Sequence, residues 1–315
     1  MTGSPSSASA LRRAALRVAF SCFCAALVVP AGGAGAQVEV AVDNDLLGLR
    51  GADDPPPDYE YTHGVAVSWD ARRRDEGAGR GARWEVGQRI YTPRRDAPEP
   101  VPGERPYAGW LYGAWERVTT SARTRSRLRV EAGVTGPPSL AEPVQSAFHR
   151  IAGYQEQIGW EHQLGFEPGV IVSWGRESRL LAVGGGRQAR LEVLPSWAVR
   201  AGNVRTDAEA GVRARLGLGA GEAWTGAGAA RGVCGWMEAG VRQEAVLRDL
   251  FIDGNTFAER SPGLERRTWV AQSEAAFGVR YRRTELEYRH VLRLREYRTQ
   301  TEPHPYGSIR IRMYR

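Results

Sequence analysis

The sequence has 315 residues, a formal net charge of +7 at neutral pH and three cysteines. Its 43 basic residues are all arginines, and they are scattered along the chain rather than gathered in a block, which argues against a nucleic-acid-binding protein. Two of the cysteines lie in the first thirty residues, so that Cys234 alone remains beyond them. A chain with one cysteine forms no internal disulfide, which excludes a disulfide-stapled extracellular domain.

The N-terminal segment, residues 1–36, has the pattern of a secretory signal peptide. Three arginines between positions 12 and 17 precede an apolar run, Val18–Val29, and Ala34-Gly35-Ala36 then forms an A-x-A cleavage motif. The apolar run is too short to span a membrane as a helix. We therefore expect a cleaved signal peptide, followed by one domain over residues 37–315 without a linker or an internal repeat.

Beyond the signal peptide, apolar and polar residues alternate, as they do in β-strands. Clear examples are Leu128–Val134, Phe277–Tyr281 and Leu286–Leu294. A soluble β-sandwich would also alternate, but strands of about ten residues with Trp and Tyr near their ends are typical of membrane barrels. Turn signals separate the strands, as in Gly184-Gly185-Gly186 and Asp253-Gly254-Asn255. The prediction is an all-β protein, a transmembrane antiparallel β-barrel of the Gram-negative outer membrane.

One segment, Ala141–Gly153, breaks this pattern and has the period of a helix. Ser139 and Glu142 have the spacing of a capping box, and the position of Pro143 leaves a cap one residue later as an alternative. Gly153 is placed to end the helix. The wheel separates an apolar face from a polar one, and the two sets are Val144, Phe148 and Ile151 against Glu142, Gln145 and His149. We expect the apolar face to pack and the polar face to be presented to a site.

His149 is the candidate general base, because imidazole titrates near neutral pH. No nucleophile signature accompanies it, since the sequence contains no G-x-S-x-G and no serine obviously paired with a base. Zinc-ligand spacings and nucleotide-binding glycine loops are also missing.

Three further polar groups are ambiguous by themselves. Asp43-Asn44-Asp45 ends a predicted strand and suits a hard cation such as calcium, although Asn and Asp are more often simply turn residues. Thr62, at the start of the next strand, has the chemistry of a ligand or a hydrogen-bonding group. The pair Arg94-Arg95 could fork onto phosphate oxygens, but in a chain this rich in arginine it is ordinarily a solvated surface.

Taken in order, these groups resemble the lipid A 3′-O-deacylase family of the outer membrane (LpxR-like). Five motifs carry the resemblance: Asn44-Asp45, Tyr61-Thr62-x-Gly64, Gly87-Gln88-x-Ile90-Tyr91-Thr92-Pro93, Glu104-Arg105-Pro106-Tyr107-Ala108-Gly109-Trp110, and Gly133-x-x-Gly136-Pro137-x-Ser139 continuing to Glu142, Gln145 and His149. The dense part covers about residues 38–163.

The resemblance implies a barrel of about twelve strands with a short helix in an extracellular loop beside the active site. It implies calcium-dependent hydrolysis of the ester that carries the 3′ acyloxyacyl chain of lipid A, the membrane anchor of lipopolysaccharide. Carried over to this chain, His149 activates water, while Asn44, Asp45 and Thr62 line the site.

The resemblance also assigns the remaining candidates. Asn44, Asp45 and Glu142 are the candidate calcium ligands, and Arg94, Arg95 and Gln145 the candidate substrate-binding residues. The expected protein is a monomeric carboxylic ester hydrolase. Two rival functions remain open, namely a phospholipase on a similar barrel and a non-catalytic barrel acting as a channel or a structural element.

Overall fold

The computed structural model describes residues 37–49, 59–70, 79–184, 189–219, 233–258 and 261–314. The predicted signal peptide, residues 1–36, lies outside the described residues. So do Gly185 and Gly186 of the predicted glycine turn.

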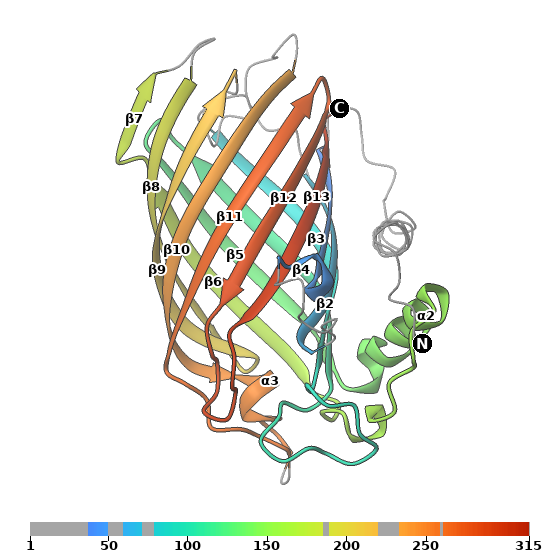
Figure 1. Ribbon diagram of the computed structural model, residues 1–315. Helices are drawn as coiled ribbons and strands as arrows, with labels where there is room; N and C mark the ends of the chain where they lie inside the picture. The colour runs from blue at the N-terminus through green and yellow to red at the C-terminus, as the bar shows by residue number, and fades with distance from the viewer. Residues whose placement is uncertain are drawn as a thin grey trace.

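The chain forms an antiparallel barrel in which each strand pairs with its neighbours along the sequence (Figure 1). The strands are β1 (Val38–Asn44), β2 (Glu60–Asp70), β3 (Gly79–Thr92), β4 (Ala108–Thr120), β5 (Thr124–Thr135), β6 (Pro168–Ser178), β7 (Leu181–Gly184), β8 (Ala189–Gly202), β9 (Arg205–Leu218), β10 (Val233–Asp249), β11 (Trp269–Tyr281), β12 (Thr284–Arg293) and β13 (His304–Met313). Pairing of β1 with β13 and of β6 with β8 closes the cylinder. The short β7 continues the line of β6 along β8, so the closed barrel has twelve strands, as predicted.

On strands such as β12, burial is the reverse of that in a soluble protein. On β12, Leu286 is 53% exposed whereas its neighbour Glu287 is 4% exposed. In water this arrangement would expose the apolar face to solvent. In a membrane, the apolar side chains face the lipid and the charged side chains face the lumen. The alternation therefore belongs to a membrane barrel and not to a sandwich. None of the helices in the described ranges is long and apolar enough to cross a membrane.

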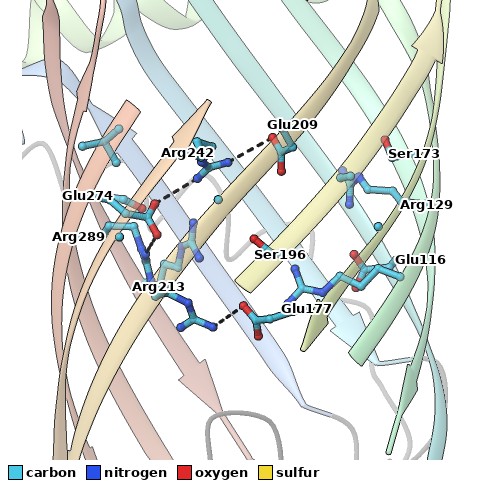
Figure 2. Close-up of a pocket in the computed structure, with 18 of the residues that line it drawn as sticks. Glu116, Arg129, Ser173, Glu177, Ser196, Glu209, Arg213, Arg242, Glu274 and Arg289 are labelled. Atoms are coloured by element: carbon cyan, nitrogen blue, oxygen red, sulfur yellow. Dashed lines mark hydrogen bonds and ion pairs between the residues drawn. The ribbon is translucent and has the colours of Figure 1, made fainter. Parts of the chain in front are cut away.

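The lumen is filled by charged side chains that pair between strands (Figure 2). Arg213 lies 2.8 Å from Glu177, and Glu274 lies 2.7 Å from Arg289 and 3.1 Å from Arg242. These groups surround a cavity of about 1290 Å³. The ion pairs compensate the charges that the alternation directs inward.

The two ends of the barrel differ. Val38 pairs with Met313 at one end, and long connections gather at the other, where Asn44 pairs with Gly307. Because outer-membrane barrels have short periplasmic turns and longer extracellular loops, we call this second end the outer end.

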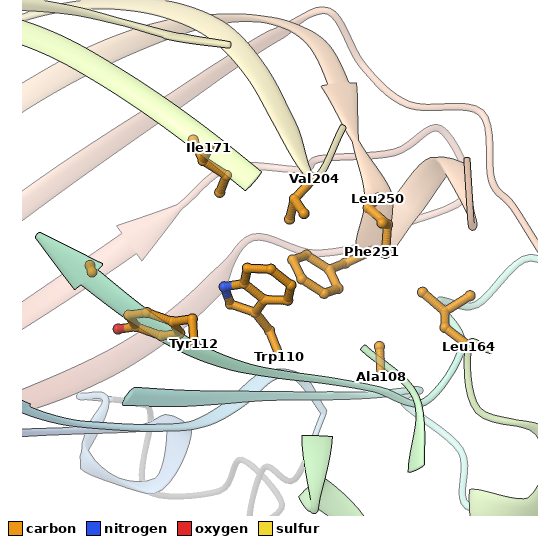
Figure 3. Packing of buried hydrophobic residues seen from close by; sticks show 9 residues of the cluster. Ala108, Trp110, Tyr112, Leu164, Ile171, Val204, Leu250 and Phe251 are labelled. Atoms are coloured by element: carbon orange, nitrogen blue, oxygen red, sulfur yellow. The ribbon is translucent and has the colours of Figure 1, made fainter. Parts of the chain in front are cut away.

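An apolar cluster packs inside the outer end (Figure 3). Its members come from β4, β6, the connections and the short helix α3 (Leu250–Asp253), and they are Ala108, Trp110, Tyr112, Ala114, Leu164, Ile171, Val204, Leu250 and Phe251. Tyr91 stacks on Phe251 with ring centroids 4.4 Å apart. Ile171, Val204 and Phe251 also line the cavity, so this cluster forms one boundary of it.

The predicted helix is α2 (Ala141–Ala152), which lies beside the barrel and outside its wall at the outer end (Figure 1). Gly153 ends it with a φ of +72°, as predicted. The predicted capping box is wrong, because the cap position is Leu140, at a φ of +58°, and no side chain caps the helix. Ser139 instead belongs to the 3₁₀ turn η2 (Pro137–Ser139), where its hydroxyl donates to the carbonyl of Gly136 at 2.6 Å.

The helix approaches β4 closely at Gly109. A Cβ atom at this position would overlap the hydroxyl of Ser139 and the side chain of Ala141. Ala141 is fully buried in the resulting contact. The close approach of α2 to the barrel wall thus depends on the missing side chain.

Gly109→Ala is expected to loosen α2 from the wall, because overpacking of this kind costs about 1–3 kcal/mol. Hydrogen exchange of the folded protein in detergent should then accelerate by about tenfold or more in α2, with the barrel strands unchanged. Gly113→Ala on the same strand is the matched control, since the nearest atom to its added Cβ is 4.0 Å away. Equal exchange in both variants would contradict this view of the docking.

Candidate active site

The end of β1 is joined to β2 by the side chain of Asn44. Its Oδ1 accepts the N–H of Leu46 at 3.0 Å and so caps the 3₁₀ turn η1 (Asp45–Leu47), while Nδ2 donates to the carbonyl of Thr62 at 3.1 Å. The sequence left open that Asp43-Asn44-Asp45 is a turn, and the structure has a turn there. It also fixes the orientation of the amide, since one end accepts and the other donates.

The two acids beside Asn44 point to different places. Asp43 lines the cavity and accepts the hydroxyl hydrogen of Tyr61 at 2.8 Å. Asp45 is fully buried, and its Oδ2 accepts the N–H of Tyr59 at 3.1 Å. Only Asp45 therefore stays with Asn44 at the candidate site.

A β-bulge in β2 brings two consecutive side chains to this site. The register with β3 shifts between Tyr61 and His63, so that Thr62 is the extra residue. The Thr62 hydroxyl lies 2.6 Å from that of Thr92, and both residues are buried. Nδ1 of His63 lies 3.5 Å from Nδ2 of Asn44.

Helix α2 reaches the same place through Phe148, whose ring stacks on His63 at 6.2 Å between centroids. The next residue, His149, is 4% exposed. Asn44, Thr62, His63 and α2 thus form one continuous set of contacts on the outer wall of the barrel, and the lumen is on the other side of that wall.

The ring of His149 is oriented by a backbone carbonyl. Its Nδ1 lies 2.6 Å from the carbonyl oxygen of Gln155, which the chain reaches by turning back after Gly153. A carbonyl only accepts, so Nδ1 carries the hydrogen, and the neutral ring has its lone pair on Nε2. This is the tautomer that a general base needs.

Gln145 is buried one turn before His149 and accepts the indole N–H of Trp160 at 2.9 Å. Trp160 belongs to the 3₁₀ turn η3 (Trp160–His162), so this bond ties α2 to the returning chain. The predicted packing face is therefore partly wrong: Gln145 and His149 are buried, whereas Ile151 is 48% exposed. Glu142 is exposed in the first turn of α2, about two turns before His149, and is not brought together with the other candidates.

The two arginines of the predicted pair, Arg94 and Arg95, contact two different acids. Arg95 donates through Nε to Glu104 at 2.6 Å, and the same carboxylate accepts the backbone N–H of Arg95 at 2.8 Å. Arg94 instead faces Glu302 at 3.3 Å, and its guanidinium lies 5.3 Å from the centre of the Tyr59 ring. Partial burial lowers the pKa of Arg94, the hydrogen bond with Glu302 raises it, and the net change is upward, so the group stays charged.

A buried arginine, Arg105, lies beside the start of β2. The sequence assigned it no role. Arg105 is 2% exposed, and it lies 2.6 Å from Glu60 and 2.9 Å from Glu296. Glu60 begins β2 with a φ of +65°, which is unfavourable for a residue with a side chain. Tyr297 donates its hydroxyl to the same carboxylate. The charge of Arg105 therefore stabilises the strained start of the strand that carries Thr62.

Glu296 is held by two arginines, Arg293 at 2.6 Å and Arg105 at 2.9 Å. Burial raises its pKa, but Arg293 and Arg105 outweigh that effect and lower the pKa to about 2. Arg105 appears in the Glu104–Trp110 motif, and Thr92 in the Gly87–Pro93 motif, so the motifs marked both positions without indicating what they do.

No group of three or more His, Cys, Asp or Glu residues is arranged to hold a metal within the described parts of the chain. The candidate residues nevertheless carry oxygens of the kind that calcium prefers, namely the carboxylate of Asp45, the side-chain amide of Asn44, and the carbonyl and hydroxyl of Thr62. In donor chemistry, Asn44, Asp45 and Thr62 fit a hard cation.

A family model described as outer membrane protein LpxR matches residues 18–315. The chain belongs to this family. The resemblance to the LpxR-like lipid A 3′-O-deacylases is thereby confirmed, and with it an outer-membrane location. No curated protein matches the sequence.

The structure is similar to that of LpxR from Salmonella typhimurium, with a TM-score of 0.76 and 20% identity over 89% of this chain and 100% of that chain. At this identity the similarity supports the LpxR fold. The β domain of the Bordetella autotransporter BrkA matches with a TM-score of 0.48 and 9% identity, over 89% of this chain and 98% of that one. The translocator domain of NalP from Neisseria meningitidis gives 0.43 and 10%, over 97% of each chain.

Arg105→Met is expected to destabilise this LpxR-family barrel by about 3–5 kcal/mol, because it leaves the buried carboxylate of Glu60 without its counter-charge and removes one of the two arginines that pair with Glu296. Urea unfolding in lipid vesicles measures the change. Arg95→Met is the control, since that side chain is 68% exposed and such surface pairs contribute about 0–1 kcal/mol. Similar losses in both variants would show that Arg105 has no special role.

Proposed function

We propose that this protein is a calcium-dependent lipid A 3′-O-deacylase, a monomer that removes the 3′-linked acyloxyacyl chain from lipopolysaccharide in the outer leaflet. The observation that carries the proposal is the orientation of His149. Its Nδ1 is engaged by the carbonyl of Gln155 at 2.6 Å, which leaves the basic lone pair on Nε2 in a buried site at the outer rim.

The location supports a substrate that lies in the membrane. Asn44 and His63 are on the outer face of the barrel, and alternation puts Val42 and Val65 on the same face one step further along β1 and β2. Val42 is only 2% exposed, whereas Val65 is partly exposed, so an acyl chain beside Val65 would lie in the hydrocarbon layer while its ester is at the rim. A substrate entering through the lumen would not reach this side of the wall.

The reaction follows from the residues. The lone pair on Nε2 of His149 accepts a proton from water as the water oxygen attacks the ester carbonyl carbon. The bond from that carbon to the sugar 3′ oxygen then breaks, and the imidazolium returns the proton to the leaving oxygen. No serine nucleophile is required, which distinguishes this proposal from a serine-dependent phospholipase.

The remaining candidates have supporting roles. Asn44 and Asp45, with Thr62, would hold the calcium ion, which when bound supplies positive charge for the oxyanion of the intermediate. Gln145 would orient α2 over the substrate. Arg94 and Arg95 are the proposed contacts for the phosphorylated headgroup, while Glu142 remains a prediction as a calcium ligand.

His149→Ala is expected to lower kcat by about 10²- to 10⁴-fold, because it removes the general base. The assay is mass spectrometry of purified lipid A incubated with detergent-solubilised protein and calcium. EDTA should stop release of the 3′ chain by the unmodified protein. His162→Ala is the matched control, since that histidine is partly exposed and lies 3.3 Å from Glu99 on the surface.

Three outcomes would count against the proposal. An active His149→Ala variant would exclude His149 as the base. An inactive unmodified protein would favour the non-catalytic barrel. Altered phospholipids with unchanged lipid A would favour the phospholipase.

A further inference from the structure

The two arginines proposed to meet the headgroup are held in different ways. Glu104 binds both the side chain and the backbone N–H of Arg95, so it fixes the course of the loop itself. Its side chain is 14% exposed. Arg95 is therefore tied to the same carboxylate through its backbone as well as its side chain.

Arg94 is held only through its side chain. Nη2 lies 3.3 and 3.4 Å from the two carboxylate oxygens of Glu302, and Nη1 donates to the hydroxyl of Thr301 at 2.8 Å. These partners are about two hundred positions away in the sequence, on the connection between β12 and β13. Both terminal nitrogens of the guanidinium are thus occupied by the protein itself.

We propose that Glu302 is an internal competitor for Arg94: its carboxylate occupies the arginine until a phosphate of the lipid headgroup displaces it. The inference rests on the proposed function and makes it more specific: of the two arginines proposed as headgroup contacts, Arg94 is the one that exchanges its protein partner for a phosphate. Without bound lipid, Glu302 then neutralises the charge of Arg94.

The geometry permits such an exchange. The side chains of Arg94 and Glu302 are 40% and 58% exposed, so water screens the pair and its contribution is small. A phosphate oxygen pair makes shorter, charge-assisted bonds with a guanidinium fork. Displacement therefore replaces a weak exposed contact with a stronger one and leaves Glu302 in solvent.

The position is also suitable. Arg94 lies over the ring of Tyr59, whose backbone N–H binds Asp45 at the candidate site. A phosphate on Arg94 would consequently lie beside Tyr59, the residue whose backbone binds the candidate calcium ligand Asp45. Glu302 then sets how tightly the substrate binds and has no part in the chemical step.

Glu302→Gln tests this directly, because it removes the charge while keeping the shape of an exposed side chain. For bisphosphorylated lipid A, KM should fall by about two- to fivefold, the range for losing an exposed ion pair, with kcat unchanged. For the same lipid A treated with phosphatase, KM should not change. Glu265→Gln is the matched control, since Glu265 is an exposed acid that pairs with an exposed arginine, Arg298, at 2.8 Å.

A binding measurement separates this inference from the proposed function. In a His149→Ala background, Glu302→Gln should tighten binding of bisphosphorylated lipid A by the same factor, without turnover. If the unmodified protein releases no 3′ chain but this tightening occurs, the deacylase proposal fails and the competitor role stands. If the chain is released and Glu302→Gln changes neither KM nor binding, or changes them equally for dephosphorylated lipid A, the competitor role is wrong.

Discussion

The hydrogen-bonded closure of the barrel is the constraint on which the rest of the structure depends. In lipid no water is present to satisfy backbone N–H and C=O groups, so every strand must have two neighbours. The pairings of β1 with β13 and of β6 with β8 complete the cylinder. Once closure is imposed, each strand has a lipid face and a lumen face. The many charged residues of this chain then have to be placed in the lumen or at the ends.

The lumen solves that problem with ion pairs between strands. Glu274, for example, contacts both Arg289 and Arg242. Charged groups would be costly in lipid. In the lumen they neutralise one another, so one face of each strand can consist of charged side chains. The chemistry proposed for the protein lies on the other side of the wall. The inside of the barrel is thus a charged, structural filling, and the outside carries the candidate site.

The candidate site exists because the regular barrel is interrupted at its outer end. The bulge at Thr62 lets β2 present two consecutive residues to one face, and Gly109 allows α2 to approach the wall. Arg105 stabilises the unfavourable backbone of Glu60 from below. A separate contact stabilises each of these irregular features, so the barrel itself positions the residues of the candidate site.

The sequence by itself determined the strands and their two chemically different faces, because a period of two over long segments is a local property, and strand length with terminal Trp and Tyr favoured a barrel over a sandwich. It also determined α2 and its end at Gly153, since helical period and a left-handed glycine are local properties. The family motifs marked Asn44, Asp45, Thr62 and His149 as belonging together, and the structure joins β1, β2 and α2 at those positions.

The tertiary structure alone decided which side of α2 packs and which arginine is held by which acid. The helical wheel predicted burial of Ile151, which is exposed, whereas Gln145 and His149 are buried because Trp160 and the carbonyl of Gln155, on the returning chain, satisfy their polar groups. Arg94 and Arg95 are adjacent in sequence, yet one pairs with Glu302 and the other with Glu104. Such long-range contacts depend on how strands far apart in the chain are brought together, and no local pattern encodes them.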